Sequence, residues 1–314
     1  MSKLILIISE EADLSTETVI DWIDYIGYSF IRINENDTIT LNKLVIDDGQ
    51  ISFTLEVDGR LIYSDNIHGV WYRRGFINMH IDINISEDIP NYELVESFIQ
   101  RDRSAISEFF HMFLHQEYRG LGIQDKTEIS KLTSLYYAQK AGLMVPQSLS
   151  TSRKESALTF MHSGEYICKG LHMSTGLTKS ITHDCLSNLD EYFMPSLIQR
   201  RIKKAYELRI FYLSGTCYSM AIFSQLDSKT EIDFRNYNDE KPNRTVPYKL
   251  PKVIEEKLVL FMNYVGLDSG SIDIIVTDSN DYIFLEVNPV GQFEMTSYPC
   301  NYNLSKKITE YLIG

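Results

Sequence analysis

The sequence has few cysteines, and none of them has the spacing that binds zinc. The four are Cys168, Cys185, Cys217 and Cys300. No two are close enough to form a CxxC pair, and no cluster of His and Cys has zinc-like spacing. We therefore expect reduced thiols in a cytoplasmic protein, without disulfides or a structural zinc site.

No hydrophobic run in the sequence is long enough to span a membrane, which takes about 18 apolar residues. The N-terminal run Leu4–Ile8 is followed by Glu10, Glu11 and Asp13. It is too short for the hydrophobic region of a signal peptide and predicts a strand that is buried on both faces. A membrane is therefore not an expected partner.

Positive charge is scarce: 30 Lys and Arg stand against 43 Asp and Glu, which gives a formal net charge of −13. Such a chain has no overall attraction for nucleic acid phosphates, so nucleic acid is not an expected partner. Any anionic ligand must be bound by a local basic site. The length of 314 residues predicts two or three closely packed lobes.

The first 118 residues predict a compact α/β lobe. A strand, a helix with Ser15 as its N-cap and a second strand form a βαβ unit. Asp58-Gly59 between two later strands is a strong hairpin signal. The predicted strands are Leu4–Ile8, Tyr28–Ile33, Gln50–Val57, Arg60–Tyr63 and Gly69–Tyr72, and the helices are Thr16–Tyr25 and Tyr92 to about Leu114.

The remainder predicts two further lobes with mixed helices and strands, residues 119–194 and 195–314. A glycine-bearing linker, residues 119–125, leads into them, and residues 227–251 predict a long functional loop. The predicted helices are Lys126–Ala141, Lys252–Val265 and Ser305–Leu312, and the predicted strands are Tyr166–Gly170, Ser196–Ile202, Glu207–Leu213, Cys217–Phe223 and two within residues 271–288. The fold class is therefore α/β, with an α+β central lobe.

The last two strands carry acidic residues among apolar ones. Side chains alternate along a strand, so Glu286 and Asn288 share a face, and Asp273 lies across from Glu286 if Val276 pairs near residues 282–283. Three oxygen donors then converge, as Mg²⁺ requires. The alternative interpretation is an ordinary solvated face of a hairpin.

These residues resemble the metal-binding signature of the ATP-grasp ligases. The resemblance covers residues 126–300 and includes Ser-Ile-Asp273-Ile-Ile, Leu-Glu286-Val-Asn288-Pro, Glu-Ile-Ser-Lys131-Leu, Tyr-Ile-Cys-Lys169-Gly, Pro-Ser-Leu-Ile-Gln199-Arg-Arg-Ile, Glu-Leu-Arg209-Ile and Asp-Phe-Arg235-Asn. It implies an ATP-grasp fold behind an N-terminal pre-ATP-grasp α/β domain. It also implies ATP and Mg²⁺, with two ions expected, as cofactors.

The resemblance implies a role for each residue. Asp273, Glu286 and Asn288 would hold the metal, and Arg209, Arg235 and Lys169 would be catalytic. The phosphate loop after Lys169 has fewer glycines than the family norm. The expected nucleotide contacts are Lys131, Lys169, Ser174, Thr175, Gly176, Gln199, Arg200 and Ile202.

One branch of the family is more similar. The segment Val70-Trp-Tyr-Arg73-Arg74-Gly75 resembles the graspetide maturases, of the microviridin and grasp-with-spasm types. That resemblance implies a ribosomal precursor peptide, with a leader and a core, as partner and ester or amide rings as product. Arg73, Arg74 and Arg235 would contact an acidic side chain of the precursor peptide. Related ligases are often homodimers.

Other interpretations stay open. The substrate could be a free amino acid or small acid, as in the branch that modifies ribosomal protein S6, or the chain could be a nucleotide-binding module without turnover. Lys131 could be a surface lysine, and Arg209 could pair with Glu207 across solvent. Arg73 and Arg74 alternate along a strand, so one at most would point into a given site. The basic run from Arg200 to Lys204 is expected to be mostly solvated.

Overall fold

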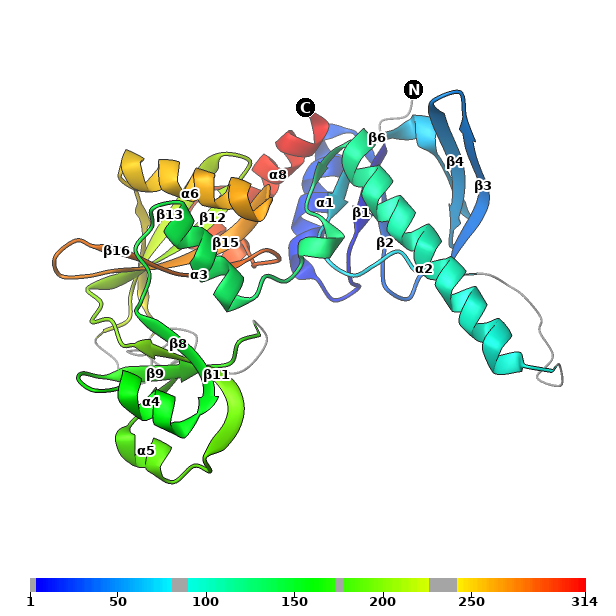
Figure 1. Ribbon diagram of the computed structural model, residues 1–314. Coiled ribbons are helices and arrows are strands. Elements are labelled where there is room, and N and C mark those ends of the chain that lie inside the picture. Colours follow the sequence, from blue (N-terminus) through cyan, green and yellow to red (C-terminus); the bar gives the residue numbers. More distant parts are fainter. Residues whose placement is uncertain (1–3, 81–89, 173–177, 226–241) are drawn as a thin grey trace. The chain divides into compact units, whose positions relative to one another are not determined.

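The computed structural model describes residues 4–80, 90–172, 178–225 and 242–314 (Figure 1). Four predicted site residues lie outside these ranges: Ser174, Thr175, Gly176 and Arg235. The chain forms two compact units, Met1–Thr127 with Asn303–Gly314, and Glu128–Tyr302. The last helix, predicted as part of the C-terminal lobe, therefore folds with the N-terminal unit. The division of the second unit at residue 195 stays a prediction.

The first unit is built on a parallel sheet in the order β2-β1-β6-β7. Helices α1 and α8 pack together against one face, and a three-stranded antiparallel sheet and α2 cover the other (Figure 1). All five residues of β1 are buried, as its continuous apolar run predicts. The elements are β1 (Leu4–Ile8), α1 (Leu14–Ile26), β2 (Ser29–Ile33), β3 (Ile39–Asp47), β4 (Gln50–Val57), β5 (Arg60–Tyr63), β6 (Ile67–Tyr72), α2 (Tyr92–Glu117), β7 (Arg119–Leu121) and α8 (Leu304–Ile313), with short 3₁₀ turns at Ser64–Asn66 and Gln124–Lys126.

Three details of this unit differ from the prediction. Helix α1 begins at Leu14, and Asp13, not Ser15, is its N-cap residue. The Asp13 side chain makes no capping bond; its carboxylate accepts from the Thr16 hydroxyl and from Arg73. Strand β3 was not predicted, and the predicted linker begins with β7, which pairs parallel to β6.

The second unit has two antiparallel sheets. The larger has the order β14-β13-β12-β15-β16 and the smaller the order β10-β9-β11-β8. Helices α3 and α6 pack against the larger sheet, α4 and α5 against the smaller. The elements are α3 (Lys131–Lys140), β8 (Ser148–Arg153), α4 (Lys154–Phe160), β9 (Tyr166–Lys169), β10 (Lys179–Ile181), α5 (His183–Ser187), β11 (Tyr192–Arg200), β12 (Tyr206–Leu213), β13 (Thr216–Phe223), β14 (Arg244–Tyr248), α6 (Lys252–Val265), β15 (Ser269–Val276), β16 (Tyr282–Asn288) and α7 (Glu294–Cys300).

The core of this unit fixes which face of the larger sheet is polar. Leu208, Ile210, Ile272 and Ile274 are buried in one apolar cluster with Phe261 of α6. Because strand side chains alternate, the residues between them point to the opposite face. That face carries Arg209 and Asp273.

Several elements here were predicted imperfectly. Helix α3 begins at Lys131, five residues later than predicted, because the Ser130 hydroxyl caps it by accepting from the Thr133 amide at 3.1 Å. Strand β14 lies inside the predicted long loop, and α4, α5 and α7 were not predicted. In the described part of the chain, no helix combines the length and apolar character needed to cross a bilayer.

Candidate nucleotide and metal site

Three charged side chains form a row across neighbouring strands of the larger sheet. Arg209 of β12 pairs with Asp273 of β15, and Asp273 pairs with Glu286 of β16. Val276 pairs with Tyr282, as the metal prediction supposes, and a bulge in β16 then brings Glu286 opposite Asp273. The predicted meeting of Asp273 and Glu286 is therefore present.

A bulge in β16 turns Glu286 toward this polar face. Ile274 pairs with Phe284, but the preceding Asp273 pairs with Glu286, so Leu285 is an extra residue. Without the bulge, Phe284 and Glu286 would share a face, and Phe284 is fully buried in the core. Leu285 itself is half-buried and lines a pocket.

Arg209 is paired with Asp273. Its Nη1 donates to both carboxylate oxygens, at 2.9 and 2.7 Å, and both side chains are about nine-tenths buried. Glu207 does not take this role, because it pairs with Lys204 in a second buried ion pair. Lys204 is only 8% exposed, so it is an exception to the predicted solvated basic run.

Lys131 lies beside the row of charged side chains, next to Glu286. It is 6% exposed, so the alternative interpretation as a surface lysine is wrong. Its Nζ donates to the carbonyl of His172 at 2.8 Å and lies 3.9 Å from Glu286 Oε2. Lys131 therefore joins the segment before the phosphate loop to the acidic hairpin.

A pocket lies beside this row and takes residues from both sheets of the unit. One part is apolar, with Ile167, Leu285 and Ile275, and the other carries charged side chains. Six predicted site residues line it: Lys169, Gln199, Arg200, Ile202, Asp273 and Glu286. Ile167, Leu285 and Glu207 were not predicted. An alternating strand pattern gave no signal for them, since ordinary core residues have the same pattern.

Gln199 has a fixed orientation in this pocket. The Ser148 hydroxyl donates to the Pro146 carbonyl at 2.7 Å, so it can only accept from the Gln199 Nε2, 2.8 Å away. Gln199 Oε1 is then turned away from Ser148. It is buried and accepts no hydrogen bond from any described residue, and such an acceptor is costly unless a ligand donates to it. An amino group on a flat ring would satisfy it.

Asp273, Glu286 and Asn288 offer two carboxylates and an amide. Asn288 pairs with Ser271 and lies two residues from Glu286 on the same strand. Among the described residues, no three His, Cys, Asp or Glu side chains gather as a ready metal cage. This donor set suits Mg²⁺, which is typically bound by one or two carboxylates with substrate phosphates and water.

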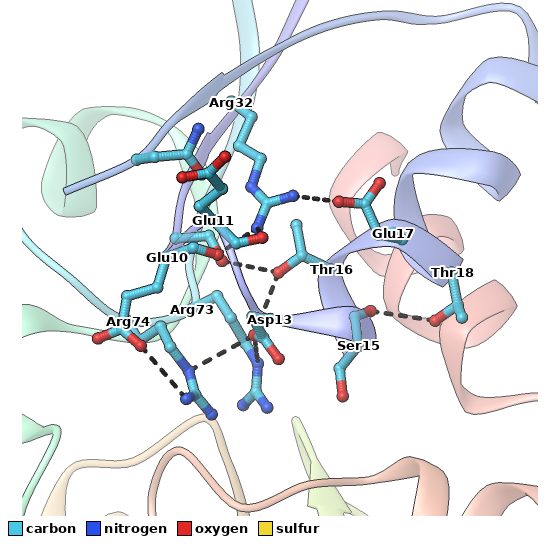
Figure 2. Close-up of polar contacts among 12 residues, drawn as sticks. Glu10, Glu11, Asp13, Ser15, Thr16, Glu17, Thr18, Arg32, Arg73 and Arg74 are labelled. Carbon is cyan, nitrogen blue, oxygen red and sulfur yellow. Dashed lines mark hydrogen bonds and ion pairs between the residues drawn. The ribbon is translucent and has the colours of Figure 1, made fainter. Parts of the chain in front are cut away.

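Arg73 and Arg74 belong to the first unit, directly after β6 ends at Tyr72. The expectation that they point to opposite faces is wrong, because strand alternation stops at Tyr72. Both amides bond to the Ile8 carbonyl, and both guanidinium groups approach Asp13, Arg73 Nε at 2.8 Å and Arg74 Nε at 3.5 Å (Figure 2). Sequence reasoning did not identify Asp13 as their partner, since 60 residues separate it from Arg73.

No protein-family model and no curated protein matches the chain, but solved structures do. It shares 26% identity with a RiPP-associated ATP-grasp ligase of Chryseobacterium gregarium in complex with ADP and a leader and core peptide, at 99% and 96% coverage of the two chains and a TM-score of 0.80. It shares 27% identity with macrocyclase MdnC of Microcystis aeruginosa MRC bound with precursor peptide MdnA, at 99% coverage of each chain and a TM-score of 0.76. The chain therefore has the ATP-grasp fold and is similar to peptide-associated ATP-grasp ligases.

The likeness extends to other members of the fold. The D-Ala:D-Ser ligase VanG of Enterococcus faecalis shares 14% identity over 100% of this chain and 99% of its own, with a TM-score of 0.55. The TM-scores of the two peptide-associated enzymes are clearly higher. The predicted fold and the predicted resemblance to graspetide maturases are therefore confirmed.

Proposed function

We propose that this ATP-grasp ligase uses ATP and Mg²⁺ to activate Asp or Glu side chains of a ribosomal precursor peptide and to join them to Ser or Thr hydroxyls or Lys amines. The observation that carries the proposal is the row Arg209, Asp273, Glu286 beside a pocket with an apolar part and a charged part. The two most similar enzymes named above, which were solved with leader and core or precursor peptides, support the substrate class.

The nucleotide fits the pocket by its chemistry. The adenine ring would pack against Ile167 and Leu285, and its exocyclic amine would donate to the buried Gln199 Oε1. Lys131 and Lys169 would neutralise phosphate charge. Ser174, Thr175 and Gly176, outside the described residues, remain proposed donors from the phosphate loop, and Arg200 and Ile202 remain proposed contacts at the pocket wall.

Asp273, Glu286 and Asn288 would hold the metal. Bound Mg²⁺ would supply charge neutralisation and Lewis acidity at the phosphates. The carboxylates need a counter-charge when no metal competes for them, and Arg209 and Lys131 supply it. Positive groups that are already in position lower the activation free energy of phosphoryl transfer, because they stabilise the charge that develops in the transition state.

The chemical steps balance without a further reactant. A peptide carboxylate oxygen attacks the γ-phosphorus, and the bond to ADP breaks. A hydroxyl or amine then attacks the acyl carbon, loses its proton and displaces phosphate, so each ring loses one water. Arg209 would stabilise the acyl phosphate with the planar set of N–H donors of its guanidinium group. Arg235 and Lys169 would contribute to the same stabilisation. Arg73 and Arg74 would bind acidic side chains of the peptide.

Incubating the protein with ATP, Mg²⁺ and a short peptide encoded beside its gene tests the proposal, provided that such a gene is found. The expected result is loss of one water per ring, by mass spectrometry, with one ADP released for each. An unchanged mass with a peptide that a related maturase does modify would contradict the peptide substrate. ADP release that depends on a free amino acid would then favour the alternative of an amino acid or small acid substrate.

A further inference from the structure

The Arg73–Arg74 pair lies at the point where the strand order of the parallel sheet reverses. From β1 the chain forms β2 on one side, and β6 pairs on the other side of β1. In open α/β sheets, ligands bind outside the carboxyl ends of the strands at such a switch point. Here Ser9–Asp13 follows β1 and Arg73–Gly75 follows β6.

The two segments are in close contact. Gly75 has φ of +77°, and a Cβ there would lie 2.9 Å from the Ser9 carbonyl oxygen. Any other side chain would therefore push the end of β6 away from the end of β1. Glycine keeps the two arginines against the loop that contains Glu10 and Asp13.

Asp13 sets the direction of both arginines. Its side chain is 4% exposed, and Oδ2 accepts from Arg73 Nε at 2.8 Å and from the Thr16 hydroxyl at 3.2 Å, with Arg74 Nε at 3.5 Å. Nε is the guanidinium nitrogen nearest the backbone, so the Nη ends of both side chains project beyond Asp13. Figure 2 shows them lying side by side.

A second carboxylate contacts this pair much more loosely. Glu10 Oε2 lies 3.5 Å from Arg74 Nη1, and the Glu10 side chain is 44% exposed. Its backbone is fixed, because Arg32 Nη2 donates to the carbonyls of Glu10 and Glu11. The Glu10 carboxylate is thus an exposed, weakly bound counter-ion on a fixed backbone. The Asp13 carboxylate is a buried counter-ion that is held by direct hydrogen bonds.

Arg74 has room for an external carboxylate, because the carboxylates of Glu10 and Asp13 approach it only to 3.5 Å. The buried Asp13 compensates one of the two arginines, and the half-exposed Glu10 screens the other only weakly, since exposed ion pairs contribute little. We propose that Glu10 holds the position at Arg74 that an acidic side chain of the peptide takes on binding, and that Asp13 is the positioning residue that presents the arginine pair. This inference rests on the proposed function.

Two substitutions with opposite expected effects test it. Glu10→Gln removes the internal competitor and lowers KM for the peptide about threefold to tenfold, and Asp13→Asn releases the arginines and raises KM about tenfold or more. Both changes fall on KM rather than kcat. Glu17→Gln is the matched control, because Glu17 is 55% exposed and pairs with Arg32, not with Arg73 or Arg74.

A merely structural role would not produce this pattern. The gain in peptide affinity of Glu10→Gln, measured by calorimetric titration, must disappear with a peptide whose Asp and Glu are replaced by Asn and Gln, which can bind but cannot be activated. An unchanged or raised KM for Glu10→Gln, or an equal gain in affinity for the amide peptide, overturns the inference. Should Asp13→Asn fail to fold by circular dichroism, Glu10→Gln decides alone. A wild-type protein that does not modify the peptide contradicts the proposed function itself.

Discussion

Arg209 and Asp273 form a buried, two-point ion pair, with Nη1 at 2.9 and 2.7 Å from the two carboxylate oxygens. The residue proposed to face the transferred phosphoryl group therefore neutralises a residue proposed to hold the metal. Removing one partner of such a pair leaves a buried charge and typically costs about 3–5 kcal/mol of stability. Substitutions here must keep shape if they are to report on function.

Asp273→Asn separates metal binding from nucleotide binding. The amide keeps the shape of the carboxylate, and Lys131, Lys169 and Gln199 remain for the nucleotide. We expect ADP affinity without Mg²⁺ to stay within about threefold of wild type, a difference below 1 kcal/mol, and Mg²⁺ to add little affinity. Calorimetric titration with and without Mg²⁺ measures both.

The control for this variant lies on the same hairpin. Asp278→Asn alters a residue that is 68% exposed and pairs only loosely with Lys203, at 3.6 Å. It should behave as wild type. If Mg²⁺ raises the ADP affinity of the Asp273→Asn variant as much as that of wild type, Asp273 is not a metal ligand.

The bulge at Leu285 provides a second prediction. Deleting Leu285 restores regular alternation and moves Glu286 to the face of Phe284, so we expect loss of ATP turnover and a lower melting temperature. Leu285→Ala keeps the bulge and removes only pocket surface, which should weaken ADP binding by about tenfold. Thermal unfolding and ADP titration compare them. A deletion variant with wild-type turnover would mean that the bulge does not orient Glu286.

Gln199 provides a third prediction, about the base. If Oε1 accepts from the adenine amine, Gln199→Leu weakens ADP binding about fivefold to tenfold, the value of one hydrogen bond. Binding of inosine diphosphate, which has an oxygen at that position, should change much less. The exposed neighbour Gln147→Leu is the control. Equal losses for the two nucleotides would place the base elsewhere.

Local patterns were enough to predict the acidic hairpin and much of the fold. The pairing of Val276 with Tyr282 follows from two apolar strands around a short turn, and α6 was predicted with its observed bounds, Lys252–Val265. Both depend on neighbours in sequence. The bulge at Leu285 was not predictable, because it has no residue signature of its own.

Contacts between segments far apart in the sequence were the main features that could not be predicted. Asp13 meets Arg73 across the parallel sheet, and Lys131 approaches Glu286 from another element. Neither partner can be read from spacing along the chain. Strand β3 was missed because its second half is mostly exposed and mixes polar and apolar residues without regular alternation. The resemblance to a family supplied Lys131 and Arg209 as candidates, and the structure supplied their partners.

The first unit should show a pH-dependent stability that His111 controls. Burial lowers the pKa of His111 to about 4 from an ordinary 6.5, against a smaller opposite effect of Asp125, and its Nε2 accepts from the Ile77 amide. The unfolded chain therefore binds a proton that the folded chain excludes between these values. Stability should fall by about 3 kcal/mol as the pH drops from 6.5 to 4.

Urea unfolding at several pH values between 4 and 7 measures this slope. His111→Gln keeps an acceptor for the Ile77 amide but does not titrate, so its stability should depend less on pH in this window. Because carboxylates also titrate there, the difference between wild type and variant is the quantity to compare. Identical slopes for the two proteins would contradict a neutral, buried His111.

Glu286→Gln tests whether the acidic hairpin is the metal site of a peptide ligase. Wild type and variant are incubated with the encoded peptide, ATP and Mg²⁺, and peptide mass, released ADP and peptide affinity are recorded together. We expect one ADP for each water lost in the wild type, and in the variant neither product but undiminished peptide binding. A variant that dehydrates the peptide at the wild-type rate would contradict the assignment of this hairpin as the metal site of a peptide ligase.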